Sequence, residues 1–271
     1  MPTLSSLIFL LCFFLLLPPA ALAEEAIPSG LKEVRAVPTT ATGAPSGASV
    51  GALVAEAANP GVPQTVAQTR FNELIGRGQT AVPELNHIYG DSKRADLEIW
   101  VAARAMGRIG GQEARVGLEG GLKSSRIMSR LGAVSGLGLM GDHQALPAIE
   151  AALFDKAMMV RAAAADALAL LRQPSSAPQL GKALNLTANF RSGKSLFVRK
   201  HIIDAIGAVG SSTSLSLLVT SVADTDPSVQ LSARRTLERM TGKKFRQGAT
   251  ISTQEIESWT NWWQSEGSQS N

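Results

Sequence analysis

The sequence contains a single cysteine, Cys12, and few aromatic residues, which make up 5% of the chain. Cys12 lies in an apolar N-terminal run, and removal of this run would leave no thiol for a disulfide, a metal site or a nucleophile. Apolar burial must then stabilise the fold, which a chain of 271 residues can achieve. Few aromatics beside frequent Ala and Gly favour closely spaced helices over a β-rich fold.

Catalytic motifs are also missing. The histidines are His87, His143 and His201; none is followed by Glu and none has a histidine four residues later, so the helical zinc-protease pattern does not occur. The sequence has no G-x-S-x-G, no P-loop and no dinucleotide fingerprint. We therefore expect no catalytic residues, no metal site and no cofactor.

The apolar run from Leu7 to Leu17 is too short for a membrane-spanning helix, which needs about 20 residues. Pro18 and Pro19 break it, and Ala21-Leu22-Ala23 then matches a signal-peptidase site. We expect a Sec-type signal peptide over residues 1–23, with the mature protein periplasmic or secreted and no longer inserted in a membrane. Because no Lys or Arg precedes the run, an uncleaved N-terminal membrane anchor is the alternative.

Residues 24–64 are rich in Ala, Pro, Gly, Ser and Thr with little helical periodicity. Such a composition buries too little apolar surface to offset its ordering entropy, so we expect a flexible linker. A short helix over 50–58 is the exception that its apolar spacing allows.

An internal repeat is the strongest signal in the chain. Five segments align through a column of large apolar residues whose members lie 31, 31, 38 and 31 residues apart: Met106, Leu137, Leu168, Ile206 and Leu237. Apolar residues also fall four positions before and three positions after this column, on one face of a helix. The next position is small in four copies, namely Gly107, Gly138, Ala169 and Gly207, as close helix approach requires.

Each of these helices follows another. The preceding segments carry Pro83, Pro147 and Pro178 in one column, where a first-turn proline lacks only an amide that would be unpaired anyway. A unit of about 31 residues is two short helices and two turns, and one such pair cannot cover its own apolar face. We expect an all-α fold: an α-solenoid of about five stacked helix pairs over residues 65–242.

These units resemble HEAT-like repeats, notably the short variety named after phycobilisome lyases. The family pattern has Asp in the turn and V-R opening the second helix. Asp155, Val160 and Arg161 match it, as do Asp226, Pro227 and Val229, and Val198 with Arg199. The resemblance implies a right-handed α-α superhelix in which this Arg and Asp form a ladder between units. Ile99 and Gln230 depart from the Arg position in the first and last copies.

Helical caps are expected at both ends of the stack. Residues 66–78 have apolar residues at helical spacing, and residues 243–271 form a Trp-rich helix and tail. Ser252 and Glu255 have capping-box spacing, and Trp259 and Trp263 share one face of the helix that follows. We favour a lid over the last repeat, packed against Met240 and Phe245; an aromatic platform for a sugar chain or peptide is the alternative.

Candidate binding residues come from two places. The 38-residue unit has a longer turn, from Leu186 to Lys194, and the net charge of +4 comes from the C-terminal part of the chain. The residues are Phe190, Arg191, Lys194, Arg199, Lys200, Arg234 and Arg235. A tolerated loop extension and a solvated helix face are the alternatives.

We expect a monomeric, non-catalytic scaffold that binds a protein partner and no nucleic acid. The resemblance also allows a lyase-type enzyme, and the basic C-terminal region allows a binder of an anionic polymer.

Overall fold

The computed structural model describes residues 47–267. Within this range the chain forms thirteen α-helices and one short hairpin, which confirms the all-α prediction. The first helices of the five pairs are α4 (Val82–Gly90), α6 (Gln112–Gly121), α8 (Leu146–Ala152), α10 (Ala177–Leu184) and α12 (Leu215–Ser221). The second helices are α5 (Asp96–Ile109), α7 (Ile127–Met140), α9 (Met158–Leu171), α11 (Val198–Val209) and α13 (Pro227–Thr241). Helices α2 (Val50–Ala57), α3 (Gln64–Gly76) and α14 (Thr253–Ser265) lie at the ends.

Short 3₁₀ turns lead into most of the first helices. They are η2 (Gly78–Ala81), η3 (His143–Ala145), η4 (Pro174–Ser176) and η6 (Ser212–Ser214), and η5 (Thr187–Asn189) precedes the hairpin strands β1 (Phe190–Arg191) and β2 (Lys194–Ser195). Pro83, Pro147 and Pro178 each stand at the start of a first helix, as the sequence predicts. None of the described helices is long and apolar enough to cross a bilayer.

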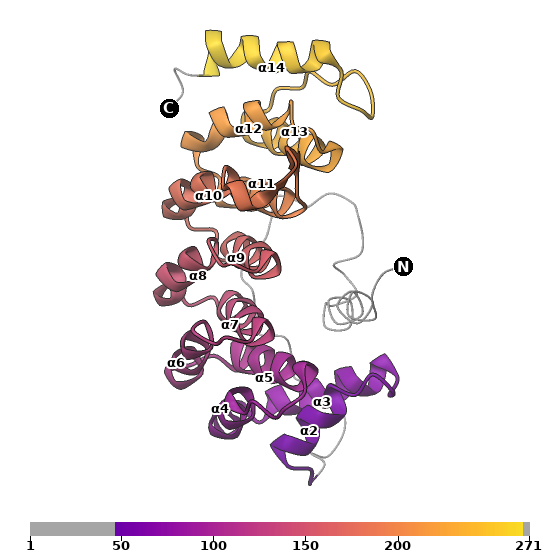
Figure 1. Ribbon diagram of the computed structural model, residues 1–271, viewed down its shortest axis with the longest axis vertical. Coiled ribbons are helices and arrows are strands. Elements are labelled where there is room, and N and C mark those ends of the chain that lie inside the picture. Colours follow the sequence, from indigo (N-terminus) through magenta and orange to yellow (C-terminus); the bar gives the residue numbers. More distant parts are fainter. Residues whose placement is uncertain (1–46, 268–271) are drawn as a thin grey trace.

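The pairs stack in chain order into one elongated solenoid (Figure 1). Each second helix packs closely on the next, whereas neighbouring first helices contact one another much less. The first helices lie along one edge of the stack and the second helices lie beside them (Figure 1). We call the solvent-facing side of the five second helices the inner face, and that of the first helices the outer face.

Small residues allow the close packing of the second helices. A Cβ atom on Gly107 of α5 would lie 2.4 Å from the carbonyl oxygen of Gly136 on α7, and one on Gly138 would lie 2.6 Å from the Cβ of Ala167 on α9. Neither distance is sterically possible without a shift. The predicted small column thus marks the crossing points of the stack.

An arginine ladder joins neighbouring units, as the family resemblance implies. Arg130 of α7 contacts Asp155 in the turn after α8, and Arg199 of α11 contacts Asp224 in the turn after α12. In the last copy Gln230 takes the Arg position and donates to the carbonyl of Asp224 at 2.7 Å. Because Asp224 lies in the turn before α13, this hydrogen bond stays within the last unit and corresponds to the bond that Arg130 donates to the Ser124 carbonyl in its own unit.

The folded part begins earlier than the predicted boundary at residue 65. The short helix expected near residue 50 forms as α2, and its Val50, Leu53 and Val54 are buried in the core against α3 and α5. Their i, i+3, i+4 spacing gives α2 an apolar face that a flexible linker would leave exposed. The linker prediction is therefore wrong for α2, and the predicted signal peptide and the linker up to residue 46 lie outside the described residues.

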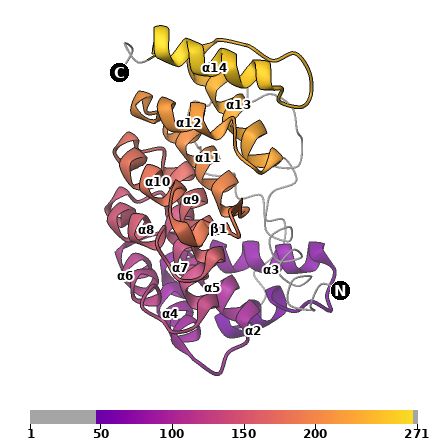
Figure 2. The ribbon, with the colours of Figure 1, turned by 45° about the horizontal axis from the view of Figure 1, so that its top comes forward.

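Helix α14 covers the last repeat at the end opposite α2 and α3 (Figure 2). Trp259 is fully buried and meets Phe245 edge-to-face, with ring centroids 4.7 Å apart. Trp262 is buried beside it. This supports the lid rather than the exposed aromatic platform. Ser252 caps α14 by accepting from the Glu255 amide, but the Glu255 side chain is buried against Arg234 instead of completing the capping box.

Candidate functional site

The long turn of the fourth pair is a small β-hairpin. Strands β1 and β2 pair Phe190 with Ser195 and Arg191 with Lys194, and Ser192 and Gly193 at the tip both have positive φ. Positive φ at both central residues is the type I′ pattern that two-residue hairpins use. The hairpin presents Arg191 and Lys194 to solvent, so these two predicted residues are accessible.

The base of the hairpin is part of the core rather than a loose extension. Asn189 is fully buried; it accepts from Nε of Arg161 at 2.8 Å and donates to the Ala183 carbonyl at 2.8 Å. Nη2 of Arg161 also donates to the Ala188 carbonyl at 2.8 Å. The insertion thus supplies the partners that the aspartate supplies to Arg130 and Arg199 in the other units.

Two of the predicted partner-binding arginines are turned into the protein. Arg199 is buried, pairs with Asp224, and lies over the Phe190 ring with its guanidinium carbon 4.4 Å from the ring centroid. Arg234 is 7% exposed and donates to the carbonyls of Gly248 and Ala249 in the segment before α14. This burial removes both arginines from the predicted binding set and leaves Phe190 half-buried beneath Arg199.

Lys200 and Arg235, by contrast, line one hollow on the inner face. The hollow lies between α11 and α13 and has a volume of about 350 Å³. Its lining residues are Lys200, Asp204, Ser228, Leu231, Ser232, Arg235, Thr236 and Arg239. The structure therefore brings together two of the predicted residues and adds Arg239, and Arg191 and Lys194 are not among the lining residues.

A histidine–aspartate pair bridges α9 and α11 on the same face. Nδ1 of His201 lies 2.7 Å from Oδ1 of Asp166, and the Phe197 ring meets the imidazole edge-to-face at 5.7 Å. Both His201 and Asp166 are partly exposed. Among the described residues, no group of three or more His, Cys, Asp and Glu side chains is arranged to hold a metal ion.

Exposed apolar side chains also lie on the second helices. Leu170 of α9 is 60% exposed, Ile127 at the start of α7 is 52% exposed, and Phe197 just before α11 is 38% exposed. Met128 and Met159 occupy the Phe197 column of their own units and are partly buried. The sequence analysis did not identify the column of Phe197, Met128 and Met159, although it lies nine residues before the large apolar column of their repeats.

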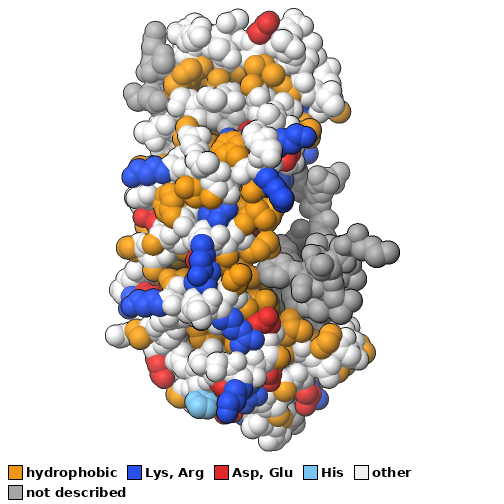
Figure 3. Space-filling model, in the orientation of Figure 1, with side chains coloured by type: hydrophobic (Ala, Val, Ile, Leu, Met, Phe, Trp, Pro, Cys, Tyr) orange, Lys and Arg blue, Asp and Glu red, His pale blue; other side chains and the backbone are white. Residues whose placement is uncertain are grey.

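One repeat position on the inner face is basic in the first and last units and acidic in the third and fourth. At the α5 end, Arg104 lies 5.4 Å from the Trp100 ring centroid, and burial, with Arg108 nearby, lowers the pKa of Arg104 to about 10. Asp166 and Asp204 occupy the equivalent repeat position on α9 and α11, and Arg235 occupies it on α13. Figure 3 shows one side of the stack, on which hydrophobic patches lie between cationic side chains.

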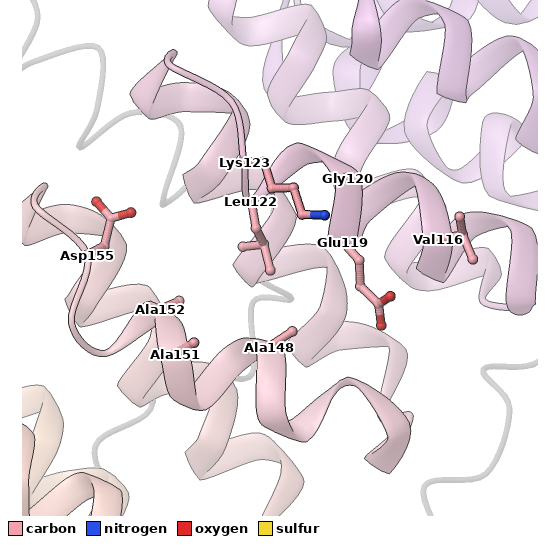
Figure 4. Close-up of a pocket in the computed structure, with 9 residues that line it drawn as sticks. All are labelled: Val116, Glu119, Gly120, Leu122, Lys123, Ala148, Ala151, Ala152 and Asp155. Carbon is pink, nitrogen blue, oxygen red and sulfur yellow. The ribbon is translucent and has the colours of Figure 1, made fainter.

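A second hollow, of about 580 Å³, opens between the first helices α6 and α8. Its lining is mainly small and apolar, with Ala148, Ala151 and Ala152 on one side and Val116 and Leu122 on the other (Figure 4). This hollow lies on the outer face, where neighbouring first helices contact one another little. Ala148, Ala151 and Ala152 have small side chains, which leave this space open.

Comparisons with known proteins agree with this architecture. The family model for HEAT repeats matches residues 117–191. The structure of the complex of CpcE and CpcF of phycocyanin lyase from Nostoc sp. PCC7120 is similar, with a TM-score of 0.52 and 22% identity over 60% of this chain and 65% of that chain. Human deoxyhypusine hydroxylase in complex with glycerol gives a TM-score of 0.41 and 16% identity over 72% of this chain and 96% of that chain. No curated protein matches the sequence.

The chain spans slightly less than two thirds of the matched CpcE–CpcF chain, and at 22% identity the likeness concerns the fold alone. The match of the family model covers the end of α6 and all of α7, α8, α9 and α10, and it includes the Arg130–Asp155 pair. The resemblance predicted from the sequence is confirmed: residues 117–191 match the HEAT-repeat model, and the chain has the fold of HEAT-like helical-repeat proteins.

Proposed function

We propose that this chain is a non-catalytic scaffold that holds a protein partner against its inner face. The observation that carries the proposal is the exposure of Leu170 on α9 and of Phe197 just before α11, in a stack whose large apolar side chains are mostly buried. Large exposed apolar residues gathered with charged ones are typical of protein-binding surfaces. Met128 and Met159, which are partly buried in the same repeat column as Phe197, add flexible side chains that adapt to a partner's shape.

The fold also supports a protein-binding function. The similar phycocyanin lyase structure is a complex of two proteins, CpcE and CpcF, so a stack of this type is compatible with protein association. A solenoid offers a long continuous surface for such contacts, because each unit adds its own exposed column. We propose that the chain acts as a monomer toward its partner.

We also propose that this binding takes place in the periplasm or outside the cell. The apolar run from Leu7 to Leu17 and the Ala21-Leu22-Ala23 site support export. Cell fractionation together with mass spectrometry of the mature N-terminus tests this: a chain in the periplasm or medium that begins at Glu24 is expected. A full-length chain recovered from the cytoplasm would contradict it.

Affinity capture from a native envelope extract tests the scaffold function. We compare the parent chain with Leu170→Glu on the inner face and with a matched variant, Val116→Glu, whose side chain is 57% exposed on the outer face. Circular dichroism verifies that both variants fold. We expect Leu170→Glu to lose a partner that the parent and Val116→Glu both retain. The same captured proteins in all three samples would refute the proposal.

The lyase-type alternative rests on the His201–Asp166 pair, since a carboxylate that orients an imidazole is one part of an acid–base site. Only bond-making or bond-breaking activity that His201→Gln abolishes without unfolding the chain would favour an enzyme. Partner capture that is unchanged in His201→Gln, with no turnover of any captured molecule, favours the scaffold.

A further inference from the structure

We infer that the hollow between α11 and α13 receives the carboxylates of a short acidic segment on the protein partner. This inference rests on the proposed scaffold function and names the chemistry of the partner. It concerns one end of the inner face, where Lys200, Arg235 and Arg239 meet around a shared depression.

The charge of the hollow is strongly unbalanced. Three cationic side chains line it, and Asp204 is the only acidic one. Asp204 is already engaged, because Nζ of Lys200 lies 2.6 Å from its Oδ2 and the Ser232 hydroxyl donates to its Oδ1. The residues that line the hollow therefore carry a formal charge of +2, and Arg235 and Arg239 are both exposed on α13.

The residue types favour carboxylates as the ligand. Arg235 and Arg239 lie four residues apart on one helix, so both guanidinium groups reach the same side of α13. A guanidinium matches a carboxylate with two parallel hydrogen bonds, which makes the pair specific as well as attractive. Leu231, one turn before Arg235, adds an apolar contact for the aliphatic stem of a glutamate.

The rest of the inner face argues for a protein segment over a long polyanion. Asp166, on α9 two units before α13, interrupts the cationic surface, and it would repel a polymer that carries a negative charge at every step. Leu170 and Phe197 lie along the same route and suit apolar side chains. A partner with carboxylates at one end of its contact segment and apolar side chains beyond them fits both features.

Binding of synthetic probes to the full chain tests the inference. The probe is a fluorescein-labelled peptide of Glu residues followed by Leu and Ala, compared with the same peptide in which Lys replaces Glu, and with labelled oligothymidylate. The proteins are the parent chain, the double variant Arg235→Ala/Arg239→Ala, and a matched control, Lys93→Ala/Lys182→Ala, which removes two exposed cations elsewhere. Fluorescence anisotropy gives each dissociation constant at low salt.

We expect the acidic peptide to bind the parent chain and the lysine control alike, and Arg235→Ala/Arg239→Ala to bind about tenfold more weakly or worse. The lysine peptide should not bind. Equal affinity of the acidic peptide for all three proteins would overturn the inference. So would oligothymidylate that binds the parent more tightly than the peptide does and depends on the same two arginines, because that pattern indicates a polyanion.

The two proposals fail in different ways. If envelope capture depends on Leu170 but neither capture nor peptide binding depends on Arg235 and Arg239, the scaffold function stands and the acidic-segment inference is wrong. If capture does not depend on Leu170 either, the proposed scaffold function itself is wrong.

Discussion

Arg130 of α7 and Asp155 in the turn after α8 form a two-point ion pair across the boundary between neighbouring repeats, with Nε–Oδ2 at 2.7 Å and Nη2–Oδ1 at 3.0 Å. Both side chains are largely buried. Because Arg130 also donates to the carbonyls of Ser124 and Ser125, it ties the turn of its own unit to the turn of the next one. The pair thus fixes the register of the stack.

Arg130→Ala should destabilise the protein strongly. Removing one partner of a buried pair leaves Asp155 desolvated and unpaired, which typically costs about 3–5 kcal/mol. Urea unfolding followed by circular dichroism measures the change. Lys200→Ala is the control, because its ion pair with Asp204 is about half exposed and such pairs contribute about 0–1 kcal/mol. Equal losses for the two variants would contradict the ladder.

Acid should weaken the stack through the same carboxylate. Burial by itself raises the pKa of Asp155, but hydrogen bonds from Arg130 and the Ala157 amide outweigh it and lower the pKa below its usual value. Hydrogen bonds from Ser228 likewise lower the pKa of Asp226. A carboxylate with a lowered folded-state pKa stabilises the fold above its unfolded pKa of about 3.9, and this contribution is lost as pH falls through the folded value.

The free energy of unfolding should therefore be steady down to about pH 4 and should then fall. Urea midpoints measured at successive pH values test this. The decline should be shallower in Asp155→Asn, which has no carboxylate to protonate at that position. An identical pH dependence in parent and variant would show that Asp155 is not a source of the acid sensitivity.

A glycine pair tests the close packing of the second helices. Gly107→Ala places a Cβ atom 2.4 Å from the Gly136 carbonyl oxygen, so α5 and α7 must separate. Overpacking of this kind costs about 1–3 kcal/mol. Gly120→Ala on α6 meets nothing within 4 Å and should stabilise the protein by about 0.4–1 kcal/mol. The melting temperature should fall for Gly107→Ala and rise for Gly120→Ala. A Gly107→Ala variant as stable as the parent would disprove the close crossing of α5 and α7.

Two adjacent arginines test the C-terminal cap. Arg234→Ala leaves the carbonyls of Gly248 and Ala249 without their donor and the buried Glu255 without its nearest cation. We expect a loss of about 3–5 kcal/mol, with early unfolding of α14 visible in Trp fluorescence. Arg235→Ala, at the next position but exposed, should change stability by less than about 0.5 kcal/mol. If both variants had the same melting temperature, Arg234 would not be a stabilising part of the core.

Most of the fold follows from local patterns that the sequence makes visible. The large apolar column through Leu137 and Leu168, the prolines that open first helices, and the glycines at crossings predicted the five pairs. The family resemblance predicted the ladder, and with it an internal role for Arg199, since Arg199 stands in the same repeat column as Arg130. The prediction that Arg199 binds a partner was inconsistent with its place in this inward-facing column.

Other features depend on contacts between segments that no local pattern specifies. Arg234 is buried because the segment before α14 folds back over it, which its charge and its place in a basic region do not indicate. Asn189 can take the place of the ladder aspartate only because Arg161 of the preceding unit lies within hydrogen-bond distance of it. Arg239 and Phe197, in contrast, occupy repeat columns that face away from the core, and alignment of those columns would have placed both on the inner face.

Site-specific photo-crosslinking in intact cells tests most directly whether a partner lies against the inner face. A photoreactive amino acid replaces Leu170 or Arg235 on the inner face, and Val116 or Ala148 on the outer face, one position at a time. The account predicts crosslinks to one common protein from positions 170 and 235 and none to it from positions 116 and 148. Crosslinks to that protein from the outer positions alone would contradict it.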